Sequence, residues 1–137
     1  MGAVEKGLVL LSRDEILRTD DFKTSEVYVE AWKGYVRLRE LSGKERSEYE
    51  RYSQEIFEKN QGDYSEAITK LIIQCAVDEN NQPLFFEQDM ERLQEKSSGV
   101  LMQLFQEACR LNKLGAEAVE ELEKNYETTP DEPSVLS

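Results

Sequence analysis

Hydrophobic and polar residues alternate with a period of two over residues 26–41, the one strong strand signal in the chain. Two alternating runs flank Lys33-Gly34, so the pattern predicts an antiparallel hairpin with a two-residue loop. The cross-strand pairs of this register are Trp32–Tyr35, Ala31–Val36, Glu30–Arg37, Val29–Leu38 and Tyr28–Arg39. One face of the hairpin then carries small apolar side chains, and the other carries three aromatic residues among charged ones.

Most of the remaining periodic segments have helical spacing. Ser12 and Glu15 form a capping box that predicts a short helix ending before Asp20-Asp21, with Leu11 and Ile16 as a hydrophobic staple. A second box at Ser42 predicts a helix from about residue 43 to 59. Its apolar stripe consists of Tyr49, Tyr52, Ile56 and Phe57.

The segment from about residue 63 to 77 is the most apolar helix and is expected at the centre of the fold. A turn at 78–83 and an extended bridge at 84–86 follow it, and then come a short helix at 88–95 and a longer one that Ser97 or Ser98 caps. A last, more polar helix contains Ala118, Val119 and Leu122 and ends near residue 125.

These elements predict an α+β, mainly helical fold in which one N-terminal antiparallel β-hairpin packs against a bundle of about five or six helices. We expect a single domain over residues 1–125. Residues 126–137 hold two of the three prolines and few core-forming residues, which predicts a disordered tail.

Charge narrows the range of partners. The chain has 137 residues, 39% of them hydrophobic, and a formal net charge of −12. Such acidity argues against nucleic acid and anionic membranes as partners, because both attract positive surfaces. No signal peptide or membrane-spanning run is recognised, so a reducing cytoplasm is the expected compartment, with Cys75 and Cys109 as buried free thiols.

The residues offer little for catalysis. The absence of histidine removes histidine-dependent triads, most zinc sites and the commonest general base. The glycines occur singly, without a phosphate-binding loop, and two dispersed cysteines do not form a zinc site alone. We therefore expect a non-enzymatic protein with no cofactor and no metal.

The outer face of the predicted hairpin is the candidate site. Tyr28, Trp32 and Tyr35 provide rigid aromatic area of the kind found at protein-binding hot spots. The alternatives are packing under the N-terminal helix and a self-association contact. Arg37 and Arg39 are candidates for binding a partner, with cross-strand pairing to acids as the simpler explanation.

Four segments in this order resemble the tail assembly chaperones of long-tailed bacteriophages and prophages. They are 11–17 (LSRDEIL), 27–41 (VYVEAWKGYVRLREL), 42–46 (SGKER) and 78–85 (DENNQPLF). The helices between Leu93 and Leu114 and the ending Glu123-Lys124-Asn125 fit the same pattern, so the resemblance covers roughly residues 8–125. The family often has Pro-Glu-Trp-Gly where this chain reads Val29-Glu30-Ala31-Trp32-Lys33-Gly34.

The resemblance implies a chaperone of virion assembly that acts in the host cytoplasm and is absent from the mature virion. Such proteins bind the tape-measure protein, keep it soluble and help recruit subunits of the major tail (tube) protein. A helix face such as that of Val119 and Leu122 would meet a client helix, or would belong to the core. The alternative function is a structural tail component, such as a tail-completion or connector protein retained in the virion.

Overall fold

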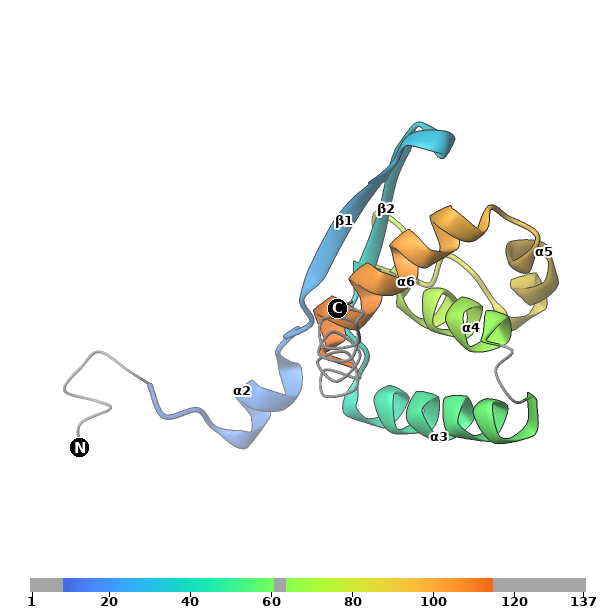
Figure 1. The fold of residues 1–137 in the computed structure, drawn as a ribbon. Helices are drawn as coiled ribbons and strands as arrows, with labels where there is room; N and C mark the ends of the chain where they lie inside the picture. Colours follow the sequence, from blue (N-terminus) through green and yellow to red (C-terminus); the bar gives the residue numbers. More distant parts are fainter. Residues whose placement is uncertain (1–8, 61–63, 115–137) are drawn as a thin grey trace, which may run out of the picture.

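An antiparallel sheet in the order β1-β2-β3 packs against helices (Figure 1). The computed structural model describes residues 9–60 and 64–114. In chain order its elements, with η marking a 3-10 helix, are α2 (Arg13–Arg18), β1 (Thr24–Val29), η1 (Glu30–Trp32), β2 (Gly34–Arg39), α3 (Gly43–Asn60), α4 (Ser65–Cys75), β3 (Ala76–Val77), η2 (Glu87–Asp89), α5 (Met90–Gln94) and α6 (Ser98–Asn112). The predicted α+β, mainly helical class is confirmed. The predicted last helix and the 126–137 tail lie outside the described residues.

The hairpin forms, but the predicted register is wrong. Val27 pairs with Val36, Tyr28 with Tyr35 and Val29 with Gly34. The strands are joined by four residues, 30–33, and the N–H of Lys33 donates to the carbonyl of Glu30 at 3.1 Å. A two-residue loop favours positive φ at its central positions. Lys33 has a φ of 55°, whereas Gly34 is already the first residue of β2.

Within strands β1 and β2 the two faces of the hairpin are nevertheless as predicted, whereas Ala31, predicted to pair with Val36 on the small apolar face, lies exposed in η1. The true pairing differs from the predicted one by four residues, and an even shift leaves every side chain on its own face. Val29, Val36 and Leu38 are 1%, 8% and 0% exposed, so this face anchors the hairpin in the core. The aromatic face points the other way.

Helix α4 is central, as its apolar sequence predicts. Leu71 and Ile72 are fully buried, and α4 packs against α3, α5, α6 and β2. The hydroxyl of Tyr49 on α3 donates to the carbonyl of Ala67 at 2.8 Å. The side chain of Phe57 lies outside the described part of the chain.

Helix α4 ends at Cys75, two residues before the predicted end. Ala76 takes an extended conformation, with φ −72° and ψ 130°. Residues 76–77 then pair with Leu38 and Arg37 as the short strand β3. Pairing with the free edge of β2 therefore makes residues 76–77 a strand, although the local sequence pattern assigns them to a helix.

Asn112 fastens the last turn of α6 to the sheet. It is 7% exposed, and its Oδ1 accepts the N–H of Leu41, just beyond β2, at 2.7 Å. Its Nδ2 donates to the carbonyl of Ala108 at 2.9 Å and lies 3.5 Å from Sγ of Cys75. A buried amide thus joins α6, α4 and the end of the hairpin.

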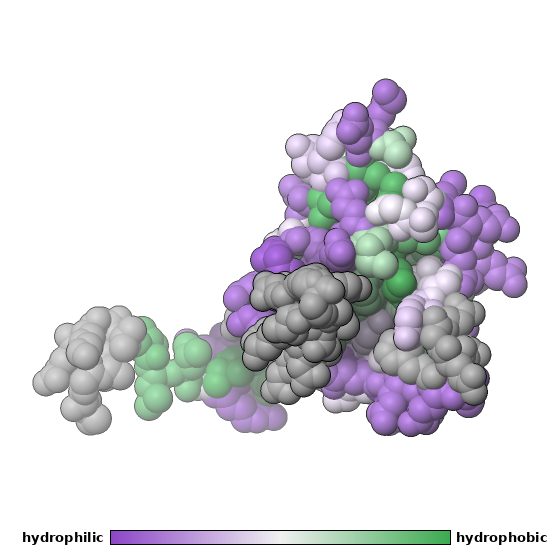
Figure 2. Space-filling view, viewed as in Figure 1, coloured by the Kyte–Doolittle hydropathy of each residue, from purple (hydrophilic) through white to green (hydrophobic). Residues whose placement is uncertain are grey.

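Residues 9–18, here called the N-terminal arm, extend away from the body (Figure 1). The predicted capping box of Ser12 and Glu15 is confirmed, but no residue of α2 is buried. The two residues of the expected staple, Leu11 and Ile16, are 56% and 55% exposed. Figure 2 shows hydrophobic surface along this arm, which contributes little to the core.

Candidate partner-binding surface

The aromatic residues singled out by the sequence lie exposed on the hairpin. Tyr28 and Tyr35 face each other across the strands with ring centroids 5.1 Å apart, in an edge-to-face arrangement. Trp32 lies in the turn η1. Their exposed fractions are 48% for Tyr28, 70% for Tyr35 and 36% for Trp32, so α2 does not bury them. Their role in binding a partner stays a prediction.

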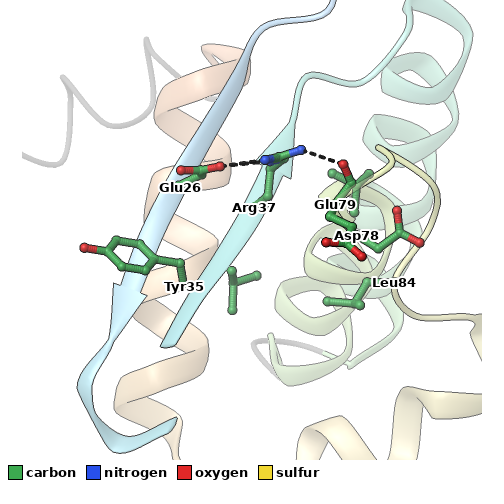
Figure 3. Close-up of a pocket in the computed structure, with 8 residues that line it drawn as sticks. Glu26, Tyr35, Arg37, Asp78, Glu79 and Leu84 are labelled. Carbon is green, nitrogen blue, oxygen red and sulfur yellow. Dashed lines mark hydrogen bonds and ion pairs between the residues drawn. The ribbon is translucent and has the colours of Figure 1, made fainter. Parts of the chain in front are cut away.

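A groove adjoins this aromatic face, between β2 and the loop that follows β3 (Figure 3). We call it the β2 groove; its volume is about 340 Å³. Its lining residues are Glu26, Tyr35, Val36, Arg37, Val77, Asp78, Glu79 and Leu84. Because Tyr35 belongs both to the groove and to the edge-to-face tyrosine pair, the groove and the aromatic face form one continuous surface.

Arg37 braces the groove from one wall to the other (Figure 3). Its Nε and Nη2 donate to Oε2 of Glu26 at 3.0 and 2.8 Å. Its Nη1 donates to Oδ1 of Asn81 at 2.9 Å and to the carbonyl of Glu79 at 3.3 Å. These hydrogen bonds connect the hairpin to the loop. Arg37 would have to break some of them to contact a partner.

The loop that forms the second wall is itself fixed by hydrogen bonds. Oδ1 of Asp78 accepts the N–H groups of Asn80 at 2.8 Å and Gln82 at 3.0 Å, an Asx-type turn. The N–H of Leu84 donates to the carbonyl of Ala76 at 3.0 Å, which returns the chain to β3. The turn predicted at 78–83 is confirmed, and it presents Leu84 to the groove at 41% exposure.

Arg39, the second arginine candidate, is also engaged within the fold. Its guanidinium makes a two-pronged contact with the carboxylate of Glu45 at 3.0 and 3.1 Å. It donates to the carbonyl of Glu40 at 2.7 Å, and its Cζ lies 4.8 Å from the ring centre of Phe22. Arg39 therefore connects Phe22, in the segment between α2 and β1, with the end of β2 and the start of α3. The candidates Val119 and Leu122 lie outside the described residues.

The thiols have no reactive character. Cys75 is buried and Cys109 half-buried, and both are free, as predicted. Burial raises the pKa of Cys75 to about 12 and that of Cys109 to about 11, so both stay protonated at neutral pH. Within residues 9–60 and 64–114, no group of three or more potential ligand side chains is placed to hold a metal ion. No helix in these ranges has both the length and the apolar character to cross a membrane.

The comparisons with known proteins agree with this picture of a binding protein. A family model described as phage tail assembly chaperone matches residues 13–125. The chain belongs to this family. The solved structure of the bacteriophage HK97 tail assembly chaperone is similar, with 26% sequence identity and a TM-score of 0.52. That match covers 66% of this chain and 85% of the HK97 chain. No curated protein sequence matches significantly.

The sequence of this family member locates the aromatic half of the surface but misses the groove. Glu26, Asp78, Glu79 and Leu84 come together only because β3 pairs with β2 and the following loop folds back. The one local signal is the polar turn at residue 78 followed directly by apolar residues. That signal predicts a turn and says nothing of which strand the turn faces.

Proposed function

We propose that this chain is the chaperone for its own phage tail: it binds the tape-measure protein, keeps it soluble and helps recruit tail-tube subunits around it. The observation that carries the proposal is the family match over residues 13–125. The work takes place in the cytoplasm of the host bacterium, and the chaperone leaves before the virion is complete.

The physical character of the chain supports this role. Exposed aromatic side chains beside an open groove provide contact area for a client. A net charge of −12 makes complexes repel one another while an apolar client is held. Both properties are useful to a protein that carries another through assembly.

Co-expression with the tape-measure protein of the same phage tests the proposal. The soluble yield of that protein should rise several-fold, and the two chains should co-purify. Unchanged solubility together with no co-purification would contradict it. Recovery of the chain in stoichiometric amounts from purified virions would instead favour a retained tail-completion or connector protein.

A further inference from the structure

The β2 groove combines exposed apolar surface with acidic side chains. Tyr35 and Leu84, 70% and 41% exposed, stand on opposite sides of it, and Val77 lies between strand and loop. Figure 3 shows Tyr35 on the hairpin side and Leu84 with Asp78 on the loop side. The ring of Tyr35 points away from Leu84 in Figure 3, so an apolar side chain entering the groove would pack on Leu84, with Tyr35 at the outer rim.

The charge of the groove determines which occupants it attracts. Its lining contains three carboxylates, Glu26, Asp78 and Glu79, and one guanidinium, which is already paired with Glu26. The exposed Glu79 is therefore the carboxylate best placed to meet a cation, while Asp78, whose Oδ1 already accepts two backbone N–H groups, adds its negative charge to the field of the groove. Because the chain as a whole carries −12, the local and the global field both favour a basic occupant.

The same charge disfavours a second copy of the chain as the occupant. A copy brings the same net charge of −12. Its exposed N-terminal arm carries Arg13 and Arg18, which Asp14 and Glu15 balance, so residues 9–18 have no net positive charge to offer. Charge complementarity therefore points to another protein.

The sheet edges limit the form that the occupant takes. On the far side of β3, Val77 forms a bridge with Pro83, and the Ala76 carbonyl already accepts the Leu84 N–H. At the other edge, Nε2 of Gln103 donates to the carbonyl of Tyr28 at 2.9 Å. Strand β3 pairs only with Arg37 and Leu38 of β2, so the stretch 34–36 alone is left as an unpaired edge at the groove, and three residues offer an added strand few backbone hydrogen bonds. Contacts to the side chains of the occupant therefore provide most of the binding, as they do for an amphipathic helix in a groove.

We propose that the β2 groove docks a basic amphipathic helix of a client protein. Apolar side chains of that helix pack on Tyr35, Tyr28 and Leu84, and its flanking lysines or arginines face Glu79 and Asp78. The brace through Arg37 holds both walls in place before binding, so little ordering is required. The identification of the client as a tail protein under assembly rests on the proposed function.

A pair of synthetic peptides tests the site directly. One is a helical peptide with leucines on one face and lysines flanking them; the other replaces every lysine with glutamate. In heteronuclear NMR titrations of the full chain, the lysine peptide should shift the amide signals of Tyr28, Tyr35, Val77, Glu79 and Leu84, and the glutamate peptide should not. Shifts centred on another face, or equal binding of both peptides, would overturn the proposal.

Two variants and two matched controls separate specific docking from general attraction to an acidic protein. Glu79→Lys and Tyr35→Ser should each raise the dissociation constant of the lysine peptide at least about tenfold. The controls are Glu55→Lys, an exposed position on α3, and Met102→Ser, which is 40% exposed on α6. They should change the constant less than about threefold. An equal effect of Glu79→Lys and Glu55→Lys would show non-specific attraction and sink the proposal.

The groove variants also distinguish this proposal from the proposed function. If the unmodified chain solubilises the tape-measure protein and Glu79→Lys and Tyr35→Ser do so equally well, the groove assignment is wrong and the chaperone function stands. If the unmodified chain itself fails, the function is wrong, and the peptide titration still decides the groove. Concentration-dependent shifts at Tyr35 and Leu84 without peptide would identify a second copy as the occupant and would also refute the proposal.

Discussion

Replacing Asn112 with alanine should destabilise the fold far more than its position at the end of a helix suggests. The substitution removes the acceptor of the Leu41 N–H, a 2.7 Å bond, and the donor to the Ala108 carbonyl at 2.9 Å. The position is 7% exposed, so water replaces neither partner without opening the junction of α6 and the sheet.

The magnitude follows from the buried groups. A buried N–H left without a partner costs about 1–3 kcal/mol, and the second hydrogen bond contributes about 1 kcal/mol. We therefore expect the free energy of unfolding to fall by about 2–4 kcal/mol. Since domains of this size have about 5–15 kcal/mol in total, the melting temperature should drop by roughly 10 °C.

Urea denaturation followed by circular dichroism measures this loss. Asn112→Leu keeps most of the side-chain volume but leaves the Leu41 N–H unpaired, so a similar loss in both variants assigns the effect to the hydrogen bonds. Gln106→Ala removes an exposed amide from the same helix and should stay within about 0.5 kcal/mol of the unmodified chain. A loss below about 0.5 kcal/mol for Asn112→Ala would show that these two hydrogen bonds do not hold α6 to the sheet.

Three further predictions concern the turn, an ion pair and the N-terminal arm. Lys33→Gly should stabilise the chain by about 0.5–1 kcal/mol, because glycine accepts a φ of 55° without strain, while Gly34→Ala should cost less than about 0.5 kcal/mol in the same denaturation assay. Hydrogen bonds, first from Arg110, lower the pKa of Glu107 from 4.5 to about 2, so its stabilising effect is complete above pH 4.5 and is lost as the pH falls towards 2. Because Arg110 is 67% exposed, we expect only about 1 kcal/mol from this group, measured as a shallower loss of stability in acid for Glu107→Gln. Leu17→Ser should leave the melting temperature within about 2 °C, because that side chain is 67% exposed; a larger drop would mean that the arm packs on the body in solution.

The sequence predicts side-chain faces well because alternation is a local property. Val29 and Leu38 are buried and Tyr35 is exposed, even though the predicted pairs are wrong. Register depends on the turn, and there the preference of Lys33-Gly34 for a two-residue loop is too weak to decide. The 3-10 turn at 30–32 and the positive φ of Lys33 determine the register.

Features formed by distant segments are the ones that the sequence does not reveal. Strand β3 forms because its backbone pairs with the edge of β2. The groove forms because the loop after β3 folds back towards Arg37, which donates a hydrogen bond to Asn81 in that loop. Asn112 is an ordinary polar residue in the pattern of α6, and only the arrival of the Leu41 N–H makes it a buried junction. The stripe of α4, by contrast, identifies the central helix without any tertiary information.

Amide hydrogen exchange of the chain, free and in complex with the tape-measure protein, locates the surface that the client covers. We expect slower exchange in the complex along residues 26–37 and 77–84, which form the aromatic face and the β2 groove. Protection confined to α3 or to the N-terminal arm, with these two segments unchanged, would contradict this expectation.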